Sequence, residues 1–545
     1  MHFSTIDLIV FFSYCVMIIV IGLWVSKEKE GEQKTAEDYF LASKALPWWA
    51  IGASLIAANI SAEQFIGMAG SGFAVGLAIA SYEWMAAVTL IVVGKYFLPI
   101  FIEKKLYTIP EFVEQRFNTT LKTILAVFWI GLFVFVNLTT VMFLGAKAID
   151  TIMGTGNGDL LLYASVGLAL FAAAYSLYGG LSAVAWTDVI QVVLLVVGGL
   201  VTSYVALNNV TPEGGIFNGF AHIYDVAGDR FHMILDQSNP EYHNLPGIAV
   251  LIGGLWVANL YYWGFNQYII QRTLAAKSLE ESQKGIIFAG FLKLLIPLLV
   301  VIPGIIVYVL FHQPEGTAHM SGIVEAFTNA NGSIDYDNSY PWLMKTFLAP
   351  GLLGLVVAAL TAAIVSSLAS MLNSVATIFT MDIYKPYFNP EADDKQTVNM
   401  GRITAGVALI IGVLLAPQLQ TVPQVFQYIQ EYTGLVSPGI LGVFLMGLFW
   451  KKTNTKGAIY GVLSSIVIAL GLKLGPVDLP FLDQMFYTII LTIVIIMGVS
   501  LTTNPNDEDP KAIYTTSKLF ETGPTFNIGA YIILLLVAFL YTVFW

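Results

Sequence analysis

The sequence predicts an all-α integral membrane protein with about 14 transmembrane helices. Of its 545 residues, 57% are hydrophobic and only 11% are charged, about half the charged fraction of a soluble globular chain. Apolar stretches of about 20 residues, the length that crosses the hydrocarbon core of a bilayer, recur along the whole chain. Two of these stretches carry polar residues in their middle, where a simple membrane anchor would be apolar.

No basic segment precedes the first apolar stretch, so we expect a retained helix rather than a signal peptide. The two longest connections, 208–246 and 313–349, are polar and acidic and contain Gly and Pro, which indicates caps over the outer face rather than separate domains. The predicted spans are 5–25, 47–70, 75–100, 122–150, 158–178, 184–207, 247–271, 285–312, 350–380, 397–417, 423–449, 456–474, 481–501 and 526–545.

Basic residues indicate the orientation. With the N-terminus placed outside, 20 of the 25 Lys and Arg residues fall on the inner side, Arg272 among them. Four fall outside and one, Lys293, falls within a span. Because Lys and Arg are enriched in cytoplasmic loops, this bias predicts a multi-pass protein of the plasma (inner) membrane, surrounded by lipid, with both termini extracytoplasmic.

Composition disfavours several classes of function. A formal charge of −11 does not suggest a nucleic-acid partner. Cys15 is the single cysteine, and six scattered histidines have no metal-ligand spacing. The chain has no Walker A sequence and no common hydrolase motif. We therefore expect neither an enzyme nor a cofactor.

The two polar interruptions carry the functional information. The first, 57–64, reads AANISAEQ, and the second, 259–267, reads NLYYWGFNQ. Lipid offers no hydrogen bonds to an interrupted backbone and does not solvate a carboxylate, so such residues line a cavity or pack within protein. Two interrupted helices at corresponding places in two halves of a chain are typical of secondary transporters with inverted repeats.

The repeats follow from the number of spans. Residues 47–210 and 247–450 each contain five predicted spans, and each set opens with an interrupted helix. Five is odd, so the second set enters the membrane in the opposite sense to the first. Residues 1–46 and 451–545 are then accessory, and 211–246 form an outer loop.

Several motifs resemble those of the solute:sodium symporter family over nearly the whole chain. The most recognisable is YGGLSAVAWTD, and SYEW with FQYIQEY resembles the sodium/galactose type within that family. The resemblance implies a leucine-transporter-type 5+5 inverted repeat that works by alternating access, with sodium as coupling ion. The matching segments are DYFL (38–41), LPWW (46–49), SYEW (81–84), YGGLSAVAWTD (178–188), SSLASMLNS (366–374), TMDIY (380–384) and FQYIQEY (426–432).

The resemblance places a sodium site between the first interruption and the span at 350–380. It implies as ligands the carbonyls of Ala57, Ile60 and Ala363 and the hydroxyls of Ser366 and Ser367. Carbonyls released from helical hydrogen bonds suit a hard cation such as sodium. Adjacent serines are also common as small packing residues between membrane helices, and the sequence leaves that alternative open.

Asp188 is a second residue with an expected role in the sodium pathway. It begins the span at 184–207 on the predicted inner side, where the family has an acidic residue along its sodium exit route. An ordinary helix N-cap would also place an Asp there, and the two roles are compatible.

The resemblance also implies a sugar site. A hexose needs amide, carboxylate and amine groups around an aromatic ring, and the implied residues have these types. Tyr262 would stack on the pyranose as the inner gate, and Asn59 would bond Tyr262 or the sugar. The implied contacts are Asn59, Gln64, Glu83, Asn259, Tyr262, Lys293 and Gln430, and the outer cover is Met68, Tyr82 and Phe426.

Lys293 is the basic residue expected deep in the membrane, which by itself suggests function. A purely structural ion pair with Glu83 explains it less well, because desolvation offsets most of the gain of a buried pair. Glu63 adjoins Gln64 and is expected to point elsewhere and stabilise the interruption. The aromatic run 261–263 lies in mid-span beside Gly264, which argues against an interface belt.

One position departs from the sugar-transporting pattern. Ala86 stands where the sodium/galactose type has a serine, so a hydroxyl contact to the sugar is expected to be missing. The expected substrate is a small neutral hexose, galactose or glucose. Another organic solute (proline, sialic acid or a carboxylate) and a sodium-dependent sensor remain the alternatives. A carboxylate would call for an arginine or a free helix N-terminus near the interruption.

Overall fold

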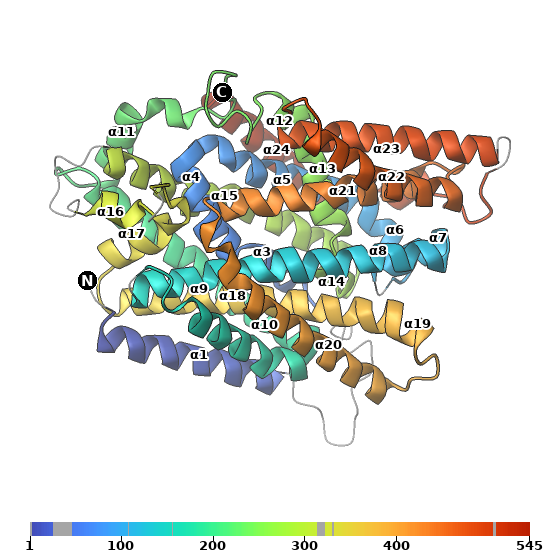
Figure 1. Ribbon diagram of the computed structural model, residues 1–545, viewed down its shortest axis with the longest axis horizontal. Coiled ribbons are helices and arrows are strands. Elements are labelled where there is room, and N and C mark those ends of the chain that lie inside the picture. The colour runs from blue at the N-terminus through green and yellow to red at the C-terminus, as the bar shows by residue number, and fades with distance from the viewer. Residues whose placement is uncertain are drawn as a thin grey trace.

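The chain forms a bundle of helices, most of which run along one common direction (Figure 1). Within the residues that this computed structural model describes, no strand occurs, so the predicted all-α class is confirmed. For 175–184 only the backbone is described, and the DYFL segment at 38–41 lies outside the described residues. The described residues are 3–25, 46–106, 108–154, 156–312, 322–329, 332–504 and 508–545.

The helices of the first half include the first interruption, between α3 and η2. They are α1 (Thr5–Val25), α3 (Trp48–Asn59), η2 (Glu63–Met68), α4 (Ala69–Val75), η3 (Leu77–Ala80), α5 (Ser81–Val92), η4 (Val93–Phe97), α6 (Leu98–Glu103), α7 (Ile109–Arg116), α8 (Thr119–Gly131), η5 (Leu132–Leu138), α9 (Thr139–Met153), α10 (Leu161–Asn209), α11 (Ile216–Val226) and η6 (Gly228–Phe231).

The helices of the second half include the second interruption, between α13 and α14, and are followed by those of 451–545. They are α12 (Ala249–Ile252), α13 (Gly254–Phe265), α14 (Gln267–Leu274), α15 (Leu279–His312), α16 (Ile323–Phe327), η7 (Tyr336–Asn338), α17 (Ser339–Phe347), α18 (Leu352–Ile378), η8 (Phe379–Tyr384), α19 (Lys385–Tyr387), α20 (Asp394–Leu415), η9 (Ala416–Thr421), α21 (Val425–Phe449), α22 (Thr455–Leu474), α23 (Phe481–Thr503), η10 (Ser517–Phe520) and α24 (Pro524–Val543).

Eleven helical segments within the described residues are long and apolar enough to cross a membrane. The predicted spans that this count omits are 47–70, 158–178 and 247–271. Two of them are the interrupted spans, which the structure divides into short helices. The third is represented by the short apolar segment 161–174.

Helical backbone continues through α10, where the sequence predicted two separate spans. A straight helix of 49 residues would be about 73 Å long. Phe171 and Ile190, which would lie about 28 Å apart in such a helix, instead pack against the same cluster, which contains Ile18 and Ala362. Both parts of α10 therefore pack against the same small cluster of α1 and α18 residues.

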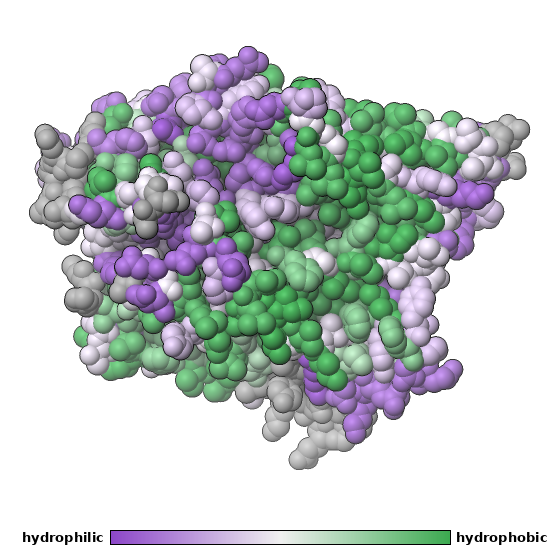
Figure 2. All heavy atoms as spheres, viewed as in Figure 1, coloured by the Kyte–Doolittle hydropathy of each residue, from purple (hydrophilic) through white to green (hydrophobic). Residues whose placement is uncertain are grey.

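Apolar side chains cover the sides of the bundle. Figure 2 shows a broad apolar area across the middle of one face, with hydrophilic residues gathered toward its left and right ends. Val467 in α22 is 71% exposed and Leu535 in α24 is 70% exposed. Exposed apolar surface of this extent is typical of a membrane-facing wall, and the chain is a multi-pass membrane protein.

Candidate functional site

The first interruption separates α3 from η2. Ile60 has extended dihedral angles, φ −77° and ψ 93°. The amide of Ser61 donates to Oε1 of Gln64 at 3.3 Å rather than to the Ala57 carbonyl four residues before it. The interruption therefore frees carbonyl oxygens inside the bundle, as a cation site requires.

The second interruption separates α13 from α14. Asn266 is extended there, with φ −83° and ψ 121°. The next residue, Gln267, accepts a hydrogen bond through Oε1 from the amide of Ile109 at 2.8 Å, which ties α14 to the start of α7. Both helices that the sequence predicted to be interrupted are broken within the predicted segments.

A cavity of about 60 Å³ lies where the two interruptions face each other. All seven residues expected to contact a sugar line it, together with Tyr82 and Phe426 from the expected outer cover. Met68 is fully buried but is not among the lining residues. The lining residues are Asn59, Glu63, Gln64, Tyr82, Glu83, Ala86, Asn137, Ala258, Asn259, Tyr262, Trp263, Asn266, Lys293, Phe426, Ile429, Gln430, Thr433 and Met485.

Lys293 of α15 makes polar contacts with several residues of this cavity. Its ammonium group donates to Glu83 of α5 and to Oδ1 of Asn59 at the end of α3. It also lies 5.1 Å from the ring centroid of Trp263, within cation–π range. Both charged side chains are at most 3% exposed. The pair thus joins three helices at the cavity wall.

Aromatic side chains close the cavity on two sides. Tyr82 and Phe426, at the N-terminal ends of α5 and α21, meet edge to face with ring centroids 5.2 Å apart. At the second interruption, the Tyr262 hydroxyl accepts hydrogen bonds from Nδ2 of Asn59 at 3.1 Å and from the hydroxyl of Tyr268 at 3.0 Å. The enclosed volume holds a few water molecules, so a pyranose ring enters only when these side chains move apart.

Several lining residues were not foreseen from the sequence. Asn137 in the π-helical segment η5 and Asn266 at the second interruption each have a buried Oδ1 without a hydrogen-bond partner. Glu63 lines the cavity beside Gln64, contrary to the expectation that it points elsewhere. The reason is that η2 is a π-helix, which turns less per residue than an α-helix. The feature that identifies these residues is an unpaired buried acceptor on the cavity wall, which the structure shows and the sequence does not.

The expected sodium ligands lie between α3 and α18. Ser367 donates through its hydroxyl to the Ala58 carbonyl at 3.2 Å, and Ser366 donates to Asp188. Both hydroxyls thus direct their protons away and keep oxygen lone pairs available for a cation. Ser366, Ser367 and Ala363 are fully buried.

Asp188 lies inside α10 and is fully buried, so the N-cap interpretation is wrong. Its carboxylate accepts from Ser54 at 2.5 Å and from Ser366, and it forms an ion pair with Arg272 at 3.3 Å. Arg272 was expected on the inner side among loop residues, but it is fully buried in α14. Its guanidinium also donates to the Ser54 carbonyl at 3.0 Å and to Ser370 at 2.5 Å.

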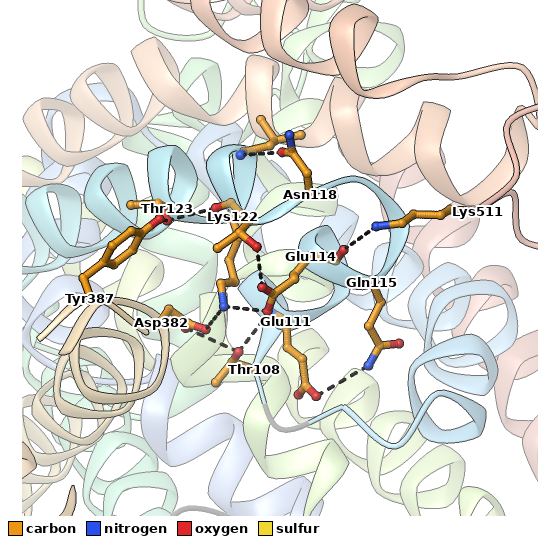
Figure 3. Close-up of polar contacts among 12 residues, drawn as sticks. Thr108, Glu111, Glu114, Gln115, Asn118, Lys122, Thr123, Asp382, Tyr387 and Lys511 are labelled. Atoms are coloured by element: carbon orange, nitrogen blue, oxygen red, sulfur yellow. Dashed lines mark hydrogen bonds and ion pairs between the residues drawn. The ribbon is translucent and has the colours of Figure 1, made fainter. Parts of the chain in front are cut away.

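A second polar cluster lies along α7 and the first turns of α8 (Figure 3). Lys122 contacts Glu114 at 2.6 Å and Asp382 of η8 at 3.8 Å. Thr108 caps α7 and donates to Asp382 at 3.4 Å. Lys511 from the segment before α24 donates to the Phe117 carbonyl at 2.7 Å. The cluster therefore fastens α7, which is bonded to α14, to the end of the α18 helix.

A helical membrane bundle with two interrupted helices around a polar cavity is typical of a secondary transporter. Residues 39–465 match the model of the sodium:solute symporter family, and the chain belongs to this family. It is accordingly a sodium-coupled transporter and not an enzyme.

Individual relatives agree with this membership. A sodium/glucose cotransporter of Vibrio parahaemolyticus is 64% identical over 542 residues, which cover 99% of this chain and 98% of that one. The human sodium/myo-inositol cotransporter 2 is 34% identical over 482 residues, covering 85% of this chain and 69% of that one. Among solved structures, a Na⁺-coupled sialic acid symporter in a substrate-bound, outward-open state superposes with a TM-score of 0.79 at 24% identity, covering 94% of this chain and all of that one. This last likeness concerns the fold.

Proposed function

We propose that this chain couples inward sodium movement to the uptake of a hexose, galactose or glucose, by alternating access. The observation that carries the proposal is the convergence of all seven expected sugar contacts on one cavity at the two interruptions. The near full-length similarity to a sodium/glucose cotransporter supports the substrate class.

The proposed sugar contacts divide by chemistry. Gln64, Asn259 and Gln430 offer amides to the ring hydroxyls, while the Glu83–Lys293 pair offers an acceptor and a donor. Tyr262 supplies the aromatic face, and Tyr82 with Phe426 and Met68 covers the site from outside. Hydroxyl-rich ligands suit this set because each amide both donates and accepts.

Sodium binds first in this mechanism. The carbonyls of Ala57, Ile60 and Ala363 and the hydroxyls of Ser366 and Ser367 hold it, which fastens the first interruption to α18 and favours the outward-open state. The sugar then binds, the outer residues close, and the two inverted repeats rock against each other. Sodium leaves inward along Asp188, the Tyr262 gate opens and the sugar follows.

The membrane arrangement is part of the proposal. Fourteen spans, of which 47–210 and 247–450 form the 5+5 inverted repeat, would place both termini outside the plasma (inner) membrane. The interruption of the first helix in each half supports this arrangement.

A carboxylate substrate such as sialic acid or proline fits the cavity less well. Lys293 is already paired with Glu83, and the buried Arg272 is paired with Asp188. No basic group that lines the cavity within the described residues is left without a carboxylate partner. A neutral polyol therefore suits the site best.

Uptake of labelled galactose into proteoliposomes tests the proposal, with an inward gradient of sodium or of potassium. Accumulation with sodium alone, reduced by excess unlabelled galactose or glucose, is the expected result. Sodium-driven uptake of myo-inositol, proline or sialic acid with galactose inert would overturn the sugar assignment and keep the coupling. Galactose binding without accumulation in either gradient would indicate a sensor.

A further inference from the structure

Gln191 in α10 is a buried amide that the mechanism above leaves unused. The side chain is 0% exposed, and neither Oε1 nor Nε2 has a hydrogen-bond partner. Buried amide groups are nearly always paired, because an unpaired one loses its hydrogen bonds to water. An amide with both polar atoms unpaired therefore indicates that something polar binds beside it.

Contacts between α10 and α18 show which residue of α18 lies at the level of Gln191 in α10. Asp188 meets Ser366, and Gly198, ten residues after Asp188, packs against Val356, ten residues before Ser366. The two helices are thus antiparallel with a constant register. The third residue after Asp188 consequently lies beside the third residue before Ser366, which is Ala363.

Contacts with α3 give a second register. Ser54 meets Asp188, and Phe65, eleven residues later, packs against Gly199, which is eleven residues after Asp188. The two segments are parallel here. The third residue after Asp188 therefore also lies beside the third residue after Ser54, which is Ala57.

Gln191 thus lies at the level of two carbonyls that the sodium site uses, those of Ala57 and Ala363. We propose that Oε1 of Gln191 is a further sodium ligand, next to the three carbonyls and two hydroxyls already assigned. This inference rests on the proposed sodium-coupled function and adds a residue to its ion site.

The chemistry of a carboxamide oxygen suits this position. It is a stronger acceptor than a hydroxyl and carries no charge, so it coordinates a monovalent cation without the desolvation cost of a buried carboxylate. The neighbouring Asp188 is already held by Arg272 and by two serine hydroxyls. Gln191, in contrast, has its oxygen uncommitted.

Thermal unfolding of the purified full-length protein tests the inference, with sodium titrated against choline. A cation that binds the folded state raises its stability with concentration. Gln191→Leu keeps the side-chain volume and removes the oxygen, so the sodium concentration for half-maximal stabilisation should rise about tenfold or more. Without sodium, the variant should unfold at the wild-type temperature or higher, because two unpaired polar atoms are gone.

Gln283→Ala is the matched control. Gln283 is a buried amide in α15 whose Nε2 donates to the Gly94 carbonyl at 3.0 Å. Its removal should lower the unfolding temperature and leave the sodium concentration for half-maximal stabilisation unchanged. The opposite signature, a less stable Gln191→Leu with normal sodium dependence, would reduce Gln191 to a structural residue and overturn the inference.

A second variant covers the case in which Gln191→Leu does not fold. Gln191→Met also removes the oxygen and keeps an unbranched side chain of similar length, so the sodium concentration for half-maximal stabilisation should again rise about tenfold. An unchanged sodium concentration in this variant would overturn the ligand assignment. If sodium neither stabilises the wild-type protein nor drives its sugar uptake, the proposed function itself is overturned. This result is obtained before any variant is made.

Discussion

Ser366 connects the proposed ion site to a buried acid, since its hydroxyl donates to Asp188. Ser366→Ala removes one proposed sodium ligand and one hydrogen bond of the carboxylate. The sodium concentration for half-maximal uptake should rise about tenfold, the effect of losing a contact worth about 1.4 kcal/mol. Initial rates of sugar uptake against sodium concentration measure it.

Ser374→Ala is the control for that substitution. Ser374 lies on the same helix and donates to Gln271 at 3.4 Å, two turns away from Ser366. Its removal should leave sodium dependence as in the wild type. If Ser366→Ala behaves in the same way, Ser366 packs between helices and binds no ion.

Ala86 offers a gain-of-contact test at the cavity wall. Ala86→Ser adds a hydroxyl where the chain has a methyl group, and one new hydrogen bond to the sugar is worth about 1 kcal/mol. The sugar concentration for half-maximal uptake should fall about fivefold. Ala87→Ser places the same hydroxyl on the neighbouring buried position, which does not line the cavity. This control should leave the sugar concentration for half-maximal uptake unchanged. Equal effects of the two substitutions would remove Ala86 from the sugar site.

At the scale of elements, the two interruptions and the bond between Asn59 and Tyr262 were predictable, and the pairing of Arg272 was not. Polar residues within apolar spans are visible in any sequence, and the breaks at Ile60 and Asn266 fall within the predicted segments. The sequence placed Arg272 with loop residues because it follows an apolar span. Its buried pairing with Asp188 joins residues 84 positions apart, and no local pattern encodes such a contact.

Asp337 holds η7 against the start of α21, because its Oδ2 accepts from the Val425 amide at 3.0 Å. Burial raises the pKa of this carboxyl from its ordinary 3.8 to about 7, although Lys147 lowers it in part. The folded state thus holds a proton that the unfolded state releases between about pH 4 and pH 7. The contribution of Asp337 to stability should therefore be full at low pH and decline as the pH rises to 7.

Unfolding temperatures between pH 5 and pH 8 check this expectation. Asp337→Asn keeps the shape and cannot ionise, so its unfolding temperature should fall less with pH than that of the wild type. Asp229→Asn, a substitution at a residue of η6, serves as the comparison. Parallel curves for the wild type and Asp337→Asn would show that Asp337 stays ionised throughout.

At the scale of the whole molecule, the transport cycle should be electrogenic. A neutral sugar carried with one sodium ion moves one net charge, and each charge crossing 100 mV is worth about 2.3 kcal/mol, or roughly fifty-fold accumulation. Proteoliposomes with equal sodium on both sides should concentrate sugar when a potassium diffusion potential makes the interior negative. Collapsing the membrane potential with an ionophore should abolish this sugar accumulation. Accumulation that does not depend on the potential would contradict the movement of one net charge per cycle.

Composition and the family motifs were sufficient to predict the helical class, the family and about half of the residues that line the cavity. Two features required coordinates. The π-helical turn of η2 brings both Glu63 and Gln64 to the cavity, and sequence periodicity assumes regular α-helices. The unpaired amide of Gln191 is invisible in sequence, because a glutamine reads the same whether or not its hydrogen bonds are satisfied.

Asn59 determines the direction of a chain of hydrogen bonds. Lys293 can only donate, so the oxygen of the Asn59 amide must face it, and the nitrogen must then face Tyr262. Tyr268 also donates to Tyr262, so the Tyr262 oxygen accepts twice. Its own proton is consequently left over and is free to turn toward the cavity. Tyr262 thereby presents a hydroxyl donor to an arriving ligand. Lys293, on another helix, determines that this hydroxyl donates there rather than accepts.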